Sequence, residues 1–190
     1  VKIVLCVLAL LSMVFLVPFE AYAADGDVKS TVEINDSTLN GPAIGNVDNF
    51  GMSVADIGDL NADGVNDIVV GATGDDRCAN NDNNCTDRGA IHIMFMNTDG
   101  SVDETVEIND FTTNGPVLTN ADYWGRSIAN IGDLNDDGVN DIAVGAPNDD
   151  RCADNDDDCT DRGAIHIMFM NRDGSMDSTV EINDFTTNGP

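Results

Sequence analysis

Basic side chains are scarce in this sequence. Its 190 residues include 8 Lys plus Arg against 35 Asp plus Glu, which gives a formal net charge of −27 at pH 7. A protein that binds nucleic acid by neutralising phosphates needs a basic face, and docking on anionic lipid needs clusters of Lys and Arg. The composition therefore excludes nucleic-acid binding of this kind and argues against docking on anionic lipid.

Aromatic residues are also few, at 5% of the chain. Highly acidic chains are often disordered because they lack enough apolar surface to form a core. Here the hydrophobic content is 42%, and short runs of Val and Ile recur along the chain. We therefore expect a folded protein with a core made mainly of aliphatic side chains.

A long hydrophobic run occurs only near the start, over residues 3–17. Lys2 precedes it, and Ala21-Tyr22-Ala23 follows, which is the pattern of a secretory signal peptide cleaved after Ala23. A membrane anchor is the weaker alternative, because about 20 apolar residues are needed to span a bilayer. We expect a chain exported to the periplasm, the cell surface or the extracellular space, with no membrane insertion after removal of residues 1–23.

The exported part holds an even number of cysteines. Cys78, Cys85, Cys152 and Cys159 form two pairs with the same spacing. In an exported chain this favours two local disulfides, Cys78–Cys85 and Cys152–Cys159. Zinc is a weak alternative, since two thiolates in a loop make half a site and neither His is near in sequence.

The chain is a tandem repeat with a period of 74 residues. The segment Thr-Val-Glu-Ile-Asn-Asp at 31–36 returns at 105–110 and at 179–184, and 53 of 74 positions are identical between 31–104 and 105–178. Such self-similarity indicates an architecture of stacked equivalent units. We expect the chain to be a fragment of a longer array.

Each unit is predicted to contain four strands and no helix. The third segment, Ala-Ile-His-Ile-Met-Phe-Met, is apolar on both faces, whereas the fourth alternates as at an outer edge. Four antiparallel strands with two of them covered on both faces fit a β-propeller blade, and a β-solenoid is the alternative. The predicted strands are 52–57, 67–72, 90–96 and 104–109, and in the second unit 126–131, 141–146, 164–170 and 178–183.

An acidic loop joins the first two strands of each unit. Oxygen-bearing side chains occupy its positions 1, 3, 5 and 9, a glycine occupies position 6, and a valine at position 7 can offer its carbonyl. This spacing suits Ca²⁺, which takes six to eight oxygen ligands, better than Mg²⁺, which demands stricter octahedral geometry. An acidic solvated turn is the alternative. The predicted ligands are Asp59, Asn61, Asp63, Val65 and Asp67, and in the second unit Asp133, Asn135, Asp137, Val139 and Asp141.

These segments together resemble the FG-GAP repeat of integrin α-subunit propellers and of bacterial integrin-α-like proteins. The first unit has Phe50-Gly51, then Gly58-Asp-Leu-Asn-x-Asp-Gly, then Asp67-Ile-Val-Val-Gly-Ala; the second has Trp124-Gly125 and ends in Gly145-Ala-Pro. Trp124 stands where the family has Phe, Thr73 replaces a Pro, and the cysteine loop is additional.

The resemblance implies a seven-bladed propeller, of which this chain would hold two blades, with one structural Ca²⁺ per repeat. It also implies that Thr31–Asp36 is an outer strand that closes the ring against the last blade. The expected organisation is a lead-in over 24–49 with this closing strand, a first repeat over 50–123, and a second repeat with the start of the next unit over 124–190.

Nothing in the sequence marks a catalytic site, because no Gly-x-Ser-x-Gly elbow or His-x-x-x-His pair is present. His92 and His166 lie on predicted third strands and are interpreted as packed side chains. The cysteine loops are interpreted as stapled surface loops, with a cation or ligand contact there as the alternative.

The sequence therefore predicts a non-enzymatic, calcium-stabilised scaffold for adhesion or ligand binding, with an extracellular protein or glycan as partner. An accessory repeat region of a secreted hydrolase and a sugar-binding propeller are the alternatives. Fold alone does not decide among these functions.

Overall fold

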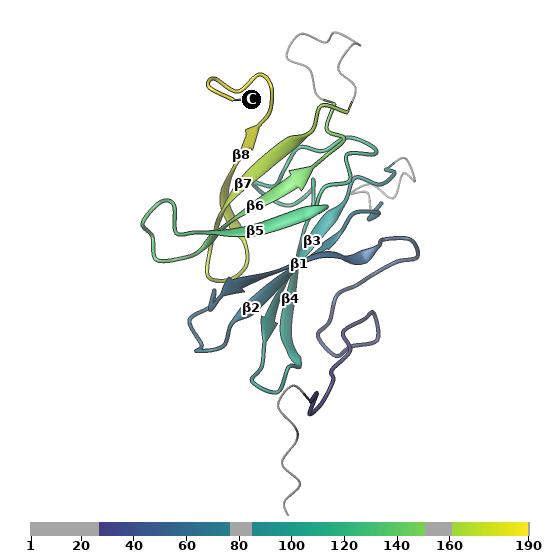
Figure 1. Cartoon of the computed structure of the whole chain (residues 1–190), viewed down its shortest axis with the longest axis vertical. Coiled ribbons are helices and arrows are strands. Elements are labelled where there is room, and N and C mark those ends of the chain that lie inside the picture. The colour runs from purple at the N-terminus through teal and green to yellow at the C-terminus, as the bar shows by residue number, and fades with distance from the viewer. Residues whose placement is uncertain (1–26, 77–84, 151–160, 190) are drawn as a thin grey trace, which may run out of the picture. The chain divides into compact units, whose positions relative to one another are not determined.

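The computed structural model describes residues 27–76, 85–150 and 161–189, and the secondary structure in these ranges consists of strands alone. Two four-stranded antiparallel sheets are formed, and in each the strand order follows the chain (Figure 1). This is the form of propeller blades, so the predicted all-β class is confirmed. The strands are β1 (Phe50–Gly58), β2 (Asp67–Ala72), β3 (Ala90–Met96) and β4 (Val102–Ile108) in the first sheet, and β5 (Ser127–Gly132), β6 (Asp141–Ala146), β7 (Ala164–Met170) and β8 (Met176–Ile182) in the second.

The two middle strands of each sheet have the predicted bounds, and the outer strands differ by one or two residues. β1 is longer than its alternating segment because the register shifts between Phe50 and Ser53 and again between Asp56 and Gly58. β4 and β8 begin two residues before the predicted start. Their pairing with the third strand also contains a shift, at Phe95–Met96 in the first sheet and Phe169–Met170 in the second. Such bulges disturb the simple alternation on which sequence reading relies.

The third strands of the two sheets differ in burial although their sequences are identical. β3 is buried at every position from Ala90 to Phe95, as expected for a strand covered on both faces. β7 alternates instead, and Ile165 is 48% exposed where Ile91 is fully buried. The expectation of two covered faces is therefore correct for the first unit and wrong for the second. Among the described residues, no segment covers the outer face of the second sheet.

A single apolar core joins the two sheets. From the first sheet it takes Val69 of β2 together with alternate residues of β3, and from the second sheet it takes alternate residues of β6 and β7 on the opposing face. Since residues two apart in a strand share a face, each sheet contributes one continuous apolar surface. The largest contributors are Ile57, Leu60, Ile91, Ile93, Phe95, Ile108, Trp124, Ile142, Met168 and Met170.

The linker between the sheets approaches the first sheet very closely at Gly125. The Ser53 hydroxyl donates a 2.6 Å hydrogen bond to the Gly125 carbonyl, and the backbone N–H of Trp124 donates one of 3.0 Å to the Arg88 carbonyl. A Cβ placed on Gly71 would overlap the Gly125 carbonyl oxygen, and one on Gly89 would overlap that of Trp124. The glycines at these positions therefore set how closely the two units pack.

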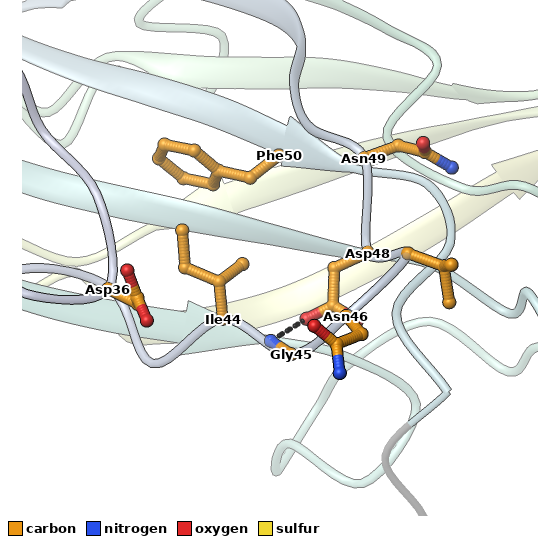
Figure 2. Close-up of a pocket in the computed structure, with 8 residues that line it drawn as sticks. Asp36, Ile44, Gly45, Asn46, Asp48, Asn49 and Phe50 are labelled. Atoms are coloured by element: carbon orange, nitrogen blue, oxygen red, sulfur yellow. Dashed lines mark hydrogen bonds between the residues drawn. The ribbon is translucent and has the colours of Figure 1, made fainter.

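The other face of the first sheet is covered by the segment that precedes β1. Ile34 of this segment and Phe50, the first residue of β1, pack with Val70, Met94 and Val102 in a second, smaller cluster. Figure 2 shows the cavity at this segment, where the Asp48 carboxylate accepts a hydrogen bond of 2.5 Å from the Gly45 N–H. Residues 32–36 form no strand in this structure. Closure of a ring by residues 31–36 stays a prediction.

The fold above belongs to a compact unit that begins at Val32. The predicted signal peptide lies outside the described residues, as do Cys78, Cys152 and Cys159. Cys85 is buried and disulfide-bonded, so it does not titrate, and its pairing with Cys78 stays a prediction. Within the described ranges, no helix has the length and apolar character needed to cross a membrane.

Candidate metal centres in the acidic loops

The two acidic loops, residues 59–66 and 133–140, connect the first strand of each sheet to the second. Each loop reverses direction through two residues of positive φ. These are Ala62 (64°) and Gly64 (95°) in the first loop, and Asp136 (61°) and Gly138 (83°) in the second. Glycine at position 6 adopts this conformation without strain, whereas position 4 adopts it with a side chain, Ala62 or Asp136. The two loops therefore share one backbone path.

Asp59 and Asp63 hold the turn of the first loop together. The Asp59 carboxylate accepts hydrogen bonds from the backbone N–H groups of Asp63 (2.9 Å) and Gly64 (3.0 Å). Asp63 in turn accepts one from the N–H of Val65 at 2.8 Å. Both carboxylates are exposed, so these bonds fix their positions while leaving lone pairs toward solvent. The side-chain amide of Asn61 donates a second hydrogen bond to Asp63, at 2.9 Å. A carboxylate has lone pairs for about four partners, and two are used at each aspartate here.

Asp67 connects the loop to the sheet. Its carboxylate is fully buried and accepts hydrogen bonds from the N–H of Leu60 (2.9 Å) and, across the sheet, from the N–H of Met96 (3.0 Å). Burial raises the pKa of Asp67 above its ordinary value, the backbone hydrogen bonds oppose that rise, and the nearby charge of Asp63 adds to it. The ninth position of the motif is thus the anchor of the loop, held by two strands.

The second loop reproduces this arrangement bond for bond. Asp133 accepts from the N–H groups of Asp137 (3.1 Å) and Gly138 (2.8 Å), and Asp141 accepts from those of Leu134 (2.8 Å) and Met170 (3.1 Å). The loops differ in their surroundings. Leu60 of the first loop is 2% exposed within the inter-sheet core, whereas Leu134 is 55% exposed.

The donor set of each loop suits a hard cation. It consists of carboxylate and amide oxygens, without nitrogen or sulfur ligands, and the exposed aspartates face one turn. The three aspartates of either loop do not, however, place one oxygen each within 4.8 Å of the other two. The carboxylates of Asp59 and Asp67 are instead directed at backbone N–H groups. The loop is therefore a preformed turn, and Ca²⁺ coordination by all five predicted ligands stays a prediction.

One cluster of ionisable residues was not recognised from the sequence. Asp149, His166 and Glu181 lie 15 or more residues apart in sequence. The pairing of β7 with β8 places His166 beside Glu181, and the turn after β6 adds Asp149. The sequence placed His166 correctly on a third strand and correctly predicted that it is packed, since it is 1% exposed. Its neighbour Glu181 could be recognised only from the register in which β7 pairs with β8, which the sequence does not give.

The fold and the duplicated loop together define this chain as a set of β-propeller blades. The model of the FG-GAP repeat matches residues 50–94 and 124–168. Human integrin alpha-11 is 41% identical over 97 residues, which are 51% of this chain and 7% of that protein. Human integrin alpha-6 is 36% identical over 124 residues, which are 65% of this chain and 10% of that protein.

Mouse integrin alpha-2 is 32% identical over 109 residues, which are 57% of this chain and 8% of that protein. The chain thus contains two FG-GAP repeats and is integrin-α-like, which confirms the resemblance seen in the sequence. It spans at most about a tenth of the length of these relatives.

Proposed function

We propose that this protein is a secreted, non-catalytic β-propeller scaffold for adhesion or ligand binding, in which Ca²⁺ stabilises each blade. The observation that carries the proposal is the duplicated loop, with the same hydrogen bonds to Asp59 and to Asp133. Clustered aspartates repel one another without a counter-ion, and both loops keep the same cluster. A bound cation would remove this repulsion in each loop.

The proposed role of Ca²⁺ follows from the position of the loops. Asp67 and Asp141 are buried and reach the third strand of their sheets, while Asp59, Asp63 and their equivalents face solvent. An ion held between the exposed and the buried aspartates would join β1, β2 and β3 through one centre. Extracellular modules of this kind bind Ca²⁺ with Kd of about 10⁻⁴–10⁻³ M, so folding would depend on the calcium level outside cells.

Thermal unfolding of the whole chain in EDTA, in excess Ca²⁺ and in excess Mg²⁺ tests the proposal. At 100 times Kd each occupied site adds about 2.7 kcal/mol, which corresponds to several degrees in Tm. The double variant Asp63→Asn/Asp137→Asn should lose this gain. Asp103→Asn, which changes an exposed acidic residue on β4, is the matched control and should keep it. Equal Tm in EDTA and Ca²⁺ would contradict the calcium part of the proposal.

The adhesion part of the proposal rests on the similarity to integrin α subunits and needs a separate test. We expect the immobilised chain to retain an extracellular protein or a glycan in Ca²⁺ and to release it in EDTA. Hydrolysis of an offered glycan or peptide by the purified chain would instead support an enzyme.

A further inference from the structure

Asp149, His166 and Glu181 place one potential ligand atom each within 4.8 Å of the others. Asp149 is 3% exposed and His166 is 1% exposed, while Glu181 is half-buried. These residues lie in the turn after β6, on β7 and on β8, respectively, and none of them belongs to an acidic loop. Among the described residues, no other group of three ionisable ligand side chains converges this closely.

The fold holds each of the three side chains in place. His166 and Glu181 are directly paired across β7 and β8, and the His166 ring meets the Trp124 ring edge-on with 6.2 Å between centroids. One oxygen of Glu181 accepts a hydrogen bond of 2.5 Å from the side-chain amide of Asn183. The turn that carries Asp149 is fixed by a bond of 2.9 Å from the Gly163 N–H to the Asp149 carbonyl.

The spacing of the ligand atoms fits metal coordination better than a direct ion pair. The Nε2 atom of His166 lies 3.7 Å from Oε2 of Glu181, whereas a charge-assisted hydrogen bond would bring them to about 2.8 Å. Two ligands of a tetrahedral Zn²⁺, each about 2.0–2.1 Å from the ion, lie about 3.4 Å apart. A shift of a few tenths of an ångström would therefore bring this pair of atoms to the spacing of two zinc ligands.

The charges and the ligand types point to a divalent transition-metal ion. Two carboxylate oxygens and one imidazole nitrogen converge here in a largely buried site, and together they can hold a divalent cation. Imidazole nitrogen suits Zn²⁺ and its neighbours, whereas Ca²⁺ and Mg²⁺ prefer oxygen alone. We propose that Asp149, His166 and Glu181 form a Zn²⁺-type site, separate from the acidic loops and independent of their calcium.

The first unit supplies an internal control. Asp75, His92 and Glu107 occupy the equivalent positions, and β3 and β4 pair His92 with Glu107 in the same register. The His92 ring meets Phe50 instead of a tryptophan, at 5.5 Å. The ligand atoms of this second trio do not converge as closely as those of the first. The proposal therefore predicts one Zn²⁺ per chain instead of two.

Equilibrium dialysis of the whole oxidised chain against Zn²⁺, with millimolar Ca²⁺ present, tests this stoichiometry. We expect one bound Zn²⁺, binding weakened more than about 100-fold by His166→Gln, and binding unchanged in His92→Gln. Equal loss in both variants, or two ions per chain, would overturn the proposal.

Imidazole NMR provides a readout that does not depend on the stability of a variant. The chain contains two histidines, so ¹H–¹⁵N spectra show two rings, and the His92→Gln variant assigns them. Zn²⁺ should shift the His166 ring alone, and Mg²⁺ should shift neither. Glu181→Gln, which keeps the shape of the side chain, should weaken the Zn²⁺ effect. An unshifted His166 ring at millimolar Zn²⁺ would refute the site.

Discussion

Gly71 lies where the backbone of β2 meets the linker that leads into the second sheet. A methyl group there would overlap the Gly125 carbonyl, which is backbone and cannot move away easily. The equivalent Gly145 faces only the Ser127 hydroxyl, which can rotate. The same residue type thus meets different constraints in the two units.

We therefore predict that Gly71→Ala destabilises the protein by about 1–3 kcal/mol, the usual cost of overpacking. Gly145→Ala, the matched control, should change the free energy of unfolding by less than about 1 kcal/mol, since alanine tolerates strand backbone well. Chemical denaturation in excess Ca²⁺ measures both. Equal effects of the two substitutions would show that the close approach at Gly125 does not constrain the fold.

Asp122 is fully buried in the linker between the sheets. Its carboxylate accepts hydrogen bonds from the backbone N–H (2.6 Å) and the hydroxyl (2.8 Å) of Thr119. Burial raises the pKa of Asp122 to about 6. The hydrogen bonds from Thr119 lower this pKa, and the charges of Asp149 and Asp150 raise it further. The folded state therefore binds this proton more tightly than the unfolded state, whose carboxyl has the ordinary pKa of 3.8. The contribution of Asp122 to the free energy of unfolding therefore falls as pH rises from about 4 to about 6.

Asp122→Asn removes this titration. We expect the wild-type protein to lose on the order of 1 kcal/mol more than the variant between pH 4 and pH 7. Unfolding free energies at several pH values, at one fixed excess of Ca²⁺, give the two slopes. Asp103→Asn, on an exposed strand position, should keep the wild-type slope. Parallel curves for wild type and Asp122→Asn would contradict the raised pKa.

At the scale of elements, Trp124 joins the linker to the core between the sheets. It is fully buried, and its Nε1–H has no hydrogen-bond partner among the described residues. A buried donor without a partner costs about 1–3 kcal/mol. Phe50 occupies the equivalent place in the first unit and makes the same edge-on contact with a histidine.

Trp124→Phe should therefore change the free energy of unfolding by no more than about 1 kcal/mol, because the lost apolar area is offset by removal of the buried N–H. Trp124→Ala should cost about 3–5 kcal/mol through the cavity it leaves. Both substitutions remove the one tryptophan of the chain, so unfolding cannot be followed by tryptophan fluorescence. Circular dichroism is the suitable probe. If the two variants were equally unstable, shape complementarity of the indole would outweigh the missing hydrogen bond.

Much of this element structure could be predicted from the sequence. The second and third strands were predicted to the residue because Val and Ile runs with clear ends define them. The position of the acidic loops between the first two strands was also predicted, since Asp, Asn and Gly favour a tight turn there. The bulges in β1 and β4 and the pairing of His166 with Glu181 were not predictable, because both depend on how strands align.

Burial could be predicted less well than the strands themselves. Two identical seven-residue segments, β3 and β7, differ in exposure because their neighbours differ. Local sequence specifies which faces of a strand are apolar, while the packing of the whole unit decides which of those faces are covered. The same reasoning explains why Leu60 is buried and Leu134 is exposed.

At the scale of the whole molecule, the net charge of −27 opposes folding through self-repulsion. Two different effects could relieve it, namely general screening by salt and binding of Ca²⁺ at the loops. They differ in the concentration they need. Screening shortens the Debye length from about 30 Å at 0.01 M salt to about 3 Å at 1 M, whereas site binding saturates at millimolar calcium.

This difference leads to a prediction for the intact chain. In EDTA, raising NaCl from 0.05 M to 0.5 M should raise Tm gradually, because exposed carboxylates are screened. At a fixed 0.15 M NaCl, 2 mM CaCl₂ adds only about 0.006 M of ionic strength, which barely changes screening. A further rise of several degrees on adding that calcium must then come from bound ions. If 2 mM CaCl₂ raised Tm no more than a matched amount of NaCl, the acidic loops would act as charged turns, and the excess of Asp and Glu would be tolerated through screening alone.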